Sequence, residues 1–190
     1  GTCGIDANGK TPHKTDHLVI IGYGVTGRNL ARTASSSDIV YSIIELNPDL
    51  VRAARNDGES VVFGDATADG VLVHAGIPAA RIAVVAINDP VATRKIVGLC
   101  RQLNPAIFII VRTRYVNEAQ DLHTLGADEV GAEEFETSVE IFTVVLHKYF
   151  VPRDQIETFI ADVRADGYQM LRSRSAVGGT LPDLVRHIPQ

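Results

Sequence analysis

Three glycines set between two short apolar runs constrain this chain more than any other feature of its sequence. The apolar runs occupy 18–21 and 39–44, and the second run ends on Glu45. Short, β-branched runs of this kind are typical of strands buried on both faces, and residues 28–34 between them have helical character. The order strand, glycine turn, helix, strand predicts the start of a doubly wound α/β sheet. The glycines are Gly22, Gly24 and Gly27.

Each glycine has a reason in the chemistry of a nucleotide site. The first allows a tight turn off the strand, the second lets backbone approach a pyrophosphate, and the third lets the helix pack close to the sheet. Free N–H groups at the helix start, with the helix dipole behind them, attract phosphate. A glycine turn that binds nothing is the alternative.

Glu45 lies 18 residues after Gly27, at the tip of the neighbouring strand. A carboxylate there can accept from two ribose hydroxyls. Leu46, Asn47 and Pro48 follow it, so no arginine stands nearby to receive a 2′-phosphate. The sequence therefore favours an unphosphorylated adenosine ribose.

Strand and helix patterns alternate as far as residue 130, which predicts a parallel, Rossmann-like sheet of six strands in the order 3-2-1-4-5-6. That order places the end of strand four, with Ala86, Ile87 and Asn88, beside the glycine turn. The expected strands are 18–21, 39–44, 60–63, 81–87, 107–111 and 126–130. The expected later helices are one beginning at Pro48, 69–74, 91–103 and 115–125, the last with Leu122 and Leu125 facing inward.

Further candidates lie at the ends of the other strands. Asp65, at the end of strand three, can accept from an adenine amino group, or it can cap the following helix. Arg112 and Arg114 are candidate phosphate partners, with surface solvation as the alternative; Arg28 is expected to face solvent rather than a phosphate. The full set of expected cofactor-binding residues is Gly22, Tyr23, Gly24, Val25, Thr26, Gly27, Glu45, Leu46, Asn47, Gly64, Asp65, Ala66, Thr67, Ala86, Ile87, Asn88 and Arg112.

The pattern changes after residue 130. A long helix at 134–150 carries a wide apolar stripe, and a second helix is expected at 154–166. So wide a stripe predicts a homodimer interface. The alternative is that the second helix folds back and covers the stripe. Residues 1–16 and the end of the chain, from 172, have linker composition. The stripe consists of Phe135, Val139, Phe142, Val145, Leu146 and Tyr149.

Composition excludes several classes of protein. The net charge of −5 argues against a nucleic-acid binder, and no apolar run reaches the length of a membrane span. The histidines have no ligand spacing, so no metal site is expected. The two cysteines form no disulfide framework, and Cys100 is expected to be a buried thiol. We find no catalytic set of residues and expect no enzymatic activity.

The motifs together resemble the RCK or KTN (TrkA-N) family of nucleotide-binding regulatory domains. The similarity covers about 17–150, and the segment after it resembles that of Kef-type monovalent cation–proton antiporters. The resemblance implies a domain at 17–150, an extension at 151–190, a site for NAD(H), AMP, ADP or ATP, and an attached or associated potassium transporter or channel at the cytoplasmic side of the membrane. The motifs are Gly22-Tyr-Gly-Val-Thr-Gly27-Arg28, Glu45, Gly64-Asp65-Ala66-Thr67, Ala86-Ile87-Asn88-Asp89, Arg112-Thr-Arg114 and Gly126-Ala-Asp128-Glu-Val130.

The sequence departs from this family at one informative place. Members that sense ATP through a neighbouring subunit often have an arginine inside the glycine turn, where this chain has Val25 and Thr26. The identity of the nucleotide therefore stays open. Two other functions also stay open: a small NAD-dependent oxidoreductase, and a soluble redox or energy sensor that acts on another protein.

Overall fold

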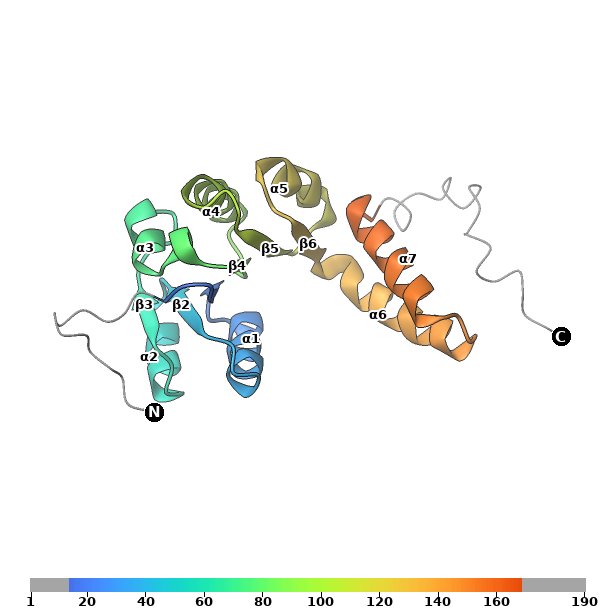
Figure 1. Cartoon of the computed structure of the whole chain (residues 1–190), viewed down its shortest axis with the longest axis horizontal. Coiled ribbons are helices and arrows are strands. Elements are labelled where there is room, and N and C mark those ends of the chain that lie inside the picture. The colour runs from blue at the N-terminus through green and yellow to red at the C-terminus, as the bar shows by residue number, and fades with distance from the viewer. Residues whose placement is uncertain (1–13, 169–190) are drawn as a thin grey trace.

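The computed structural model describes residues 14–168 of the chain (Figure 1). Residues 1–13 of the linker expected at 1–16, Cys3 among them, lie outside the described residues, as does the linker expected from residue 172. Asp16, the last residue of the expected linker, pairs with Arg81 just before β4. Within them the sheet is entirely parallel and has the expected order, β3-β2-β1-β4-β5-β6. The strands are β1 (Leu18–Ile21), β2 (Tyr41–Glu45), β3 (Val61–Phe63), β4 (Ile82–Val85), β5 (Phe108–Thr113) and β6 (Glu129–Ala132).

Helices cover both faces of this sheet. Figure 1 shows α1 (Val25–Ser36) and α2 (Pro48–Asn56) on one face, and α3 (Asp69–His74), α4 (Pro90–Leu103) and α5 (Ala119–Leu125) on the other. Because side chains alternate along a strand, Ile20 packs with the first group and Val19 with the second. Short 3₁₀ turns, η1 (Ile77–Ala79) and η2 (Val116–Glu118), precede β4 and α5.

The expected boundaries around β6 were wrong by a few residues. Gly126 has φ of 115°, so it ends α5 in the left-handed region instead of starting a strand. Asp128 accepts a hydrogen bond from the Ile109 amide and bridges to β5 just before β6 begins. The helix expected from 115 starts instead as the η2 turn, and Leu125, expected inside, is 39% exposed.

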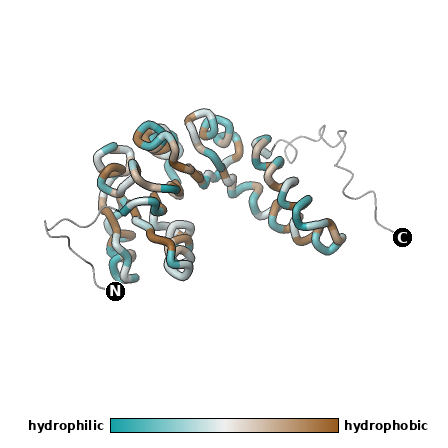
Figure 2. The backbone as a smooth tube through the Cα atoms, in the orientation of Figure 1, coloured by the Kyte–Doolittle hydropathy of each residue, from teal (hydrophilic) through white to brown (hydrophobic). Residues whose placement is uncertain are grey.

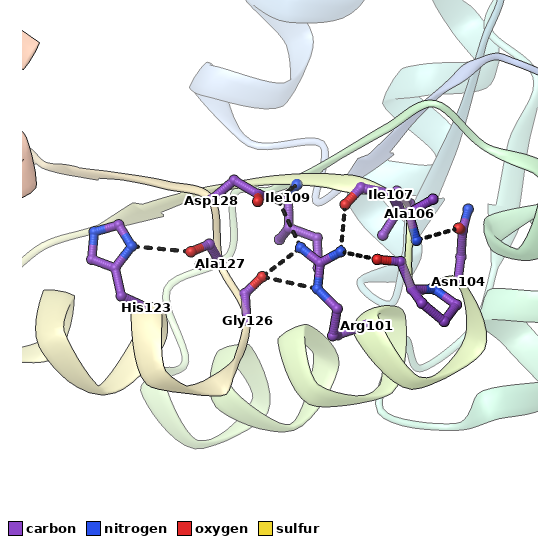
Figure 3. Close-up of polar contacts among 10 residues, drawn as sticks. Arg101, Asn104, Ala106, Ile107, Ile109, His123, Gly126, Ala127 and Asp128 are labelled. Atoms are coloured by element: carbon purple, nitrogen blue, oxygen red, sulfur yellow. Dashed lines mark hydrogen bonds and ion pairs between the residues drawn. The ribbon is translucent and has the colours of Figure 1, made fainter.

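Arg101 fastens α4 to the start of β5 and to the link between α5 and β6 (Figure 3). Its guanidinium donates to the carbonyls of Pro105, Ile107 and Gly126 and pairs with Asp128. Because these partners occupy the donors of the guanidinium, we assign Arg101 a role in holding the fold together. The neighbouring Cys100 is buried, as expected, and burial raises the pKa of its thiol to about 12.

Two helices, α6 (Glu133–Lys148) and α7 (Arg153–Ala165), extend away from the sheet and lie side by side (Figure 1). Figure 2 shows apolar and polar stretches alternating along both. The apolar residues Ile156, Phe159 and Val163 of α7 pack against Val139 and Leu146 of α6. The alternative expectation, that the second helix folds back on the stripe, thus holds for one side of α6.

The other side of α6 keeps apolar side chains at its surface. Of the predicted stripe, Val145 and Tyr149 are 39% and 56% exposed, whereas Phe142, which is 38% exposed, packs against Phe159 of α7. Ile141 and Val144, which the stripe did not include, are 60% and 55% exposed. The helix ends at Lys148 because the backbone turns into the left-handed region at Phe150, where φ is 59°.

Tyr168 joins the end of α7 to β6 and α6. Its buried hydroxyl accepts from the Ala132 amide and donates to Glu136, which also takes two hydrogen bonds from Arg164. Burial and the bond to Glu136 raise the pKa of Tyr168 to about 12. Burial alone would raise the pKa of Glu136, but the hydrogen bonds from Arg164 and Tyr168 hold it below its ordinary value.

Candidate functional site

The three glycines of the turn after β1 differ in what the fold requires of them. Gly22 has φ of 103°, and a Cβ there would lie 2.8 Å from the Ala86 carbonyl oxygen. A Cβ at Gly27 would lie only 1.9 Å from the Gly22 carbonyl oxygen. A Cβ at Gly24 would meet nothing within 4 Å, and its backbone is extended with φ of −70°. Packing requires glycine at 22 and 27 but not at 24, where glycine is only one of several residues that suit an N-cap.

The start of α1 leaves backbone donors uncapped. Gly24 is its N-cap and supplies no side chain, and no acidic residue stands in the first turn. By contrast, Asn47 caps α2 and Asp89 caps α4 through their side-chain oxygens. The first N–H groups of a helix lack partners within the helix, so α1 offers donors and the positive end of its dipole to an anion. Val25, which is 80% exposed, and Thr26 lie at this end.

Glu45 is buried and holds the glycine turn. Its Oε2 accepts from the Tyr23 amide at 2.7 Å, and its Oε1 accepts from the amides of Leu46 and Asn47 at 2.8 and 2.7 Å. A carboxylate has about four acceptor positions, and these bonds use three of them. One acceptor position therefore remains free, whereas the sequence predicted that Glu45 would accept from two ribose hydroxyls.

Tyr23 contributes its backbone to this site, while its side chain points elsewhere. The ring is buried, and its hydroxyl donates to Asp57 at the end of α2. Burial and this bond raise the pKa of Tyr23. Arg28 lies over the same ring, 5.4 Å from its centroid, and pairs with Asp57 at 3.3 Å. The expectation that Arg28 simply faces solvent was therefore wrong.

The turn after β3 presents an exposed carboxylate. Asp65 accepts a hydrogen bond from the Thr67 amide at 2.8 Å, and this bond holds the pKa of the carboxyl below its usual value. The N-cap of α3 is Ala68, so Asp65 shapes its own turn and does not cap the helix. Ala66 is buried beneath it, and Gly64 packs against the Val71 side chain of α3.

The ends of β4 and β5 complete the edge of the site. Ala86 and Ile87 contact the Gly22 turn, and Asn88 follows. Arg112, inside β5 rather than just after it, donates from Nη2 to Asn88 Oδ1 at 2.6 Å and pairs through Nη1 with Glu133. Arg114 is exposed beyond the strand.

The predicted residues thus lie along the carboxyl edge of the parallel strands, around the turn after β1; we call this region the glycine crevice. A groove of about 1320 Å³ continues from it, lined by Thr26, Arg112 and Glu133 among others, and runs to α6 and α7. Sequence reasoning missed Glu133 as a partner of Arg112, because the pairing depends on where β6 ends. Asn47 as the cap of α2 was also missed, although an Asn before Pro48 is a typical N-cap signal.

Residues 14–168 contain no group of three or more potential metal ligands. No helix among them is long and apolar enough to cross a membrane.

Comparison with known proteins places the chain in a family. The model of the TrkA-N domain matches residues 18–132, which is more than half of the chain, and the chain therefore belongs to the TrkA-N domain family. It is 29% identical over 158 residues to the putative K⁺ efflux antiporter KefB of Alkalimonas amylolytica. That match covers 83% of this chain and 24% of the antiporter, so the chain spans about a quarter of this relative's length.

Solved structures with the same fold include a domain of an inner membrane protein and a channel. The TrkA-N domain of the Escherichia coli inner membrane protein ybaL is 27% identical, with a TM-score of 0.65 over 69% of this chain and 97% of that one. The Shewanella denitrificans Kef CTD in its AMP-bound form is 24% identical, with a TM-score of 0.63 over 82% and 98%. The GsuK channel bound to NAD is 22% identical, with a TM-score of 0.58 over 75% and 24%.

Proposed function

We propose that this chain is a regulatory domain that binds an adenine nucleotide in the glycine crevice and gates an attached or associated membrane cation transporter. The nucleotide-binding domain is residues 17–150, and residues 151–190 form its extension. The domain acts at the cytoplasmic side of the membrane.

The strongest support for this proposal comes from the surroundings of Gly24. Its backbone suits any residue and a side chain there would meet nothing, yet the position stands directly before the uncapped start of α1. A ligand that approaches this backbone closely would explain why the residue here has no side chain. Glu45, with one acceptor position left and no arginine after it, suits a ribose without a 2′-phosphate.

NAD(H), AMP, ADP and ATP all contain adenosine with a 5′-phosphate, the group that this edge suits, and the proposal includes them all. The AMP-bound Kef CTD and the NAD-bound GsuK channel support that range. The antiporter relative and the channel neighbour also support a transport role in preference to the oxidoreductase alternative.

The proposal includes a homodimer formed through α6. The side of this helix that α7 leaves uncovered carries Ile141, Val144 and Val145, which are 39–60% exposed. A row of exposed apolar side chains on a helix suits burial against a second copy in a two-fold interface.

A thermal-unfolding screen of the purified chain tests the ligand class. AMP, ADP, ATP, NAD and NADH are compared with NADP and with GMP as matched controls. Because a ligand that binds only the folded state stabilises it, we expect at least one adenine nucleotide to raise the unfolding temperature and NADP to raise it less. Equal shifts for all of them, or none, contradict the proposed site.

A further inference from the structure

A chain of contacts runs from the glycine crevice to the first residue of α6. The Gly22 turn packs on Ala86 and Ile87, and Asn88 follows at the end of β4. Asn88 accepts from Arg112, and Arg112 pairs with Glu133. These residues thus connect the phosphate end of the crevice to a helix that projects from the domain (Figure 1).

Arg112 lies at the centre of this series of contacts, and one of its hydrogen-bond donors has no partner. Its side chain is 19% exposed, and its Nε is buried without a hydrogen-bond partner. A buried guanidinium donor without a partner is uncommon and points to a group that the site is built to receive. Arg112 and Thr26, from the uncapped first turn of α1, line the same groove. A phosphate chain that starts at the N-terminus of α1 and continues along this groove would reach Arg112.

We propose that Glu133 competes with the phosphates of the nucleotide for Arg112, so that filling the crevice releases the start of α6. Glu133 and a phosphate are both anions that pair with a guanidinium, and phosphate takes it in bidentate geometry. Binding that draws Arg112 away from Glu133 weakens the tie to α6. By linkage, any change that weakens this tie strengthens nucleotide binding to the same degree.

This inference rests on the proposed function, and it assigns Glu133 as a positioning residue for Arg112. It gives the regulation a physical route. The crevice does not need to deform the sheet, because one arginine exchanges a helix carboxylate for a ligand phosphate.

Titration calorimetry on the full chain tests the competition, with ADP and adenosine as probes. Glu133→Gln should bind ADP several-fold more tightly than wild type and bind adenosine unchanged, because only ADP carries phosphate. Glu140→Gln is the matched control, since it removes the same charge from the same helix and the same groove without touching Arg112. In an Arg112→Gln background, Glu133→Gln should give no gain.

Hydrogen exchange supplies a second readout. In wild type, ADP should speed amide exchange at 137–141 in α6, whereas in Glu133→Gln these amides should already exchange faster without ligand. If Glu133→Gln and Glu140→Gln bind ADP alike, the competition is wrong while the nucleotide site stands. If wild type binds neither ADP, AMP nor NAD, the proposed function fails and this inference fails with it.

Discussion

Gly24 and Gly27 both lie at the start of α1, but substituting them should change the stability of the fold to very different degrees. Gly27→Ala forces a methyl group to 1.9 Å from the Gly22 carbonyl oxygen, so either the helix or the turn must move. We expect a loss of about 3 kcal/mol or more in the free energy of unfolding, or failure to fold. Gly24→Ala should change that free energy by less than about 1 kcal/mol, because reduced chain entropy in the unfolded state offsets a poorer N-cap. Denaturant unfolding of both variants measures this contrast, and equal losses would contradict it.

Glu45 has a structural task beside its proposed ribose contact. Glu45→Gln replaces one acceptor oxygen by an NH₂ group that faces an amide donor, whether that of Tyr23 or those of Leu46 and Asn47. The variant should lose about 1–3 kcal/mol of stability even without nucleotide, the usual cost of an unsatisfied buried group. Chemical denaturation without ligand checks this value. A variant as stable as wild type would show that the carboxylate does not hold the turn.

Sequence reasoning succeeded at the residue scale where backbone geometry allows few alternatives. The spacing of Gly22, Gly24 and Gly27 and the position of Glu45 follow from the strand and helix periods, and the structure places them together. It failed where a long side chain has several partners within reach. Arg28 pairs with Asp57, which is distant in the sequence and lies at the end of α2. No local sequence pattern indicates that contact.

At the scale of elements, the network around Tyr168 should make the docking of α7 sensitive to acid. The pKa of Glu136 lies below its ordinary value of 4.5, so its ion pair contributes fully above that pH and is lost as pH falls through the lower, folded-state pKa. Between pH 7 and pH 3, wild type should therefore lose more stability than Glu136→Gln, which has no carboxyl to titrate there. Unfolding midpoints across this range measure the difference, and parallel curves would contradict the role of Glu136.

The uncovered side of α6 should decide the oligomeric state. Ile141→Asp places a charge in the proposed dimer interface without disturbing the packing between α6 and α7, since Ile141 is 60% exposed. We expect a folded monomer in sedimentation velocity, while wild type and the control Gln155→Asp, on the exposed face of α7, remain dimeric. A monomeric wild type, or a dimeric Ile141→Asp, would remove α6 as the interface.

Element order and sheet topology could be predicted from the sequence because apolar periodicity and glycine or proline signals are local. The relation of α6 to α7 could not be predicted uniquely. An apolar stripe records that a helix face is buried, but not whether an intramolecular or an intermolecular partner buries it. Here α7 covers Val139 and Leu146, and Ile141 and Val144 stay exposed.

At the scale of the whole molecule, the ends of the strands form the crevice. The α6–α7 pair projects from the edge of the sheet at β6 (Figure 1). The groove between them connects the site to that pair, with Arg112 at the junction. In the proposed function, this groove is the route by which nucleotide binding reaches the α6–α7 pair, where we place the dimer interface.

The central claim is that Gly24 is glycine for the sake of a ligand. Titration calorimetry with AMP, ADP and NAD on wild type and Gly24→Ala tests it directly, with unfolding measured on the same samples. Wild type should bind at least one of the three, and Gly24→Ala should bind it about tenfold or more weakly, a change of about 1.4 kcal/mol, at nearly unchanged stability. Equal affinity in the two proteins, or no binding by wild type, would contradict the account.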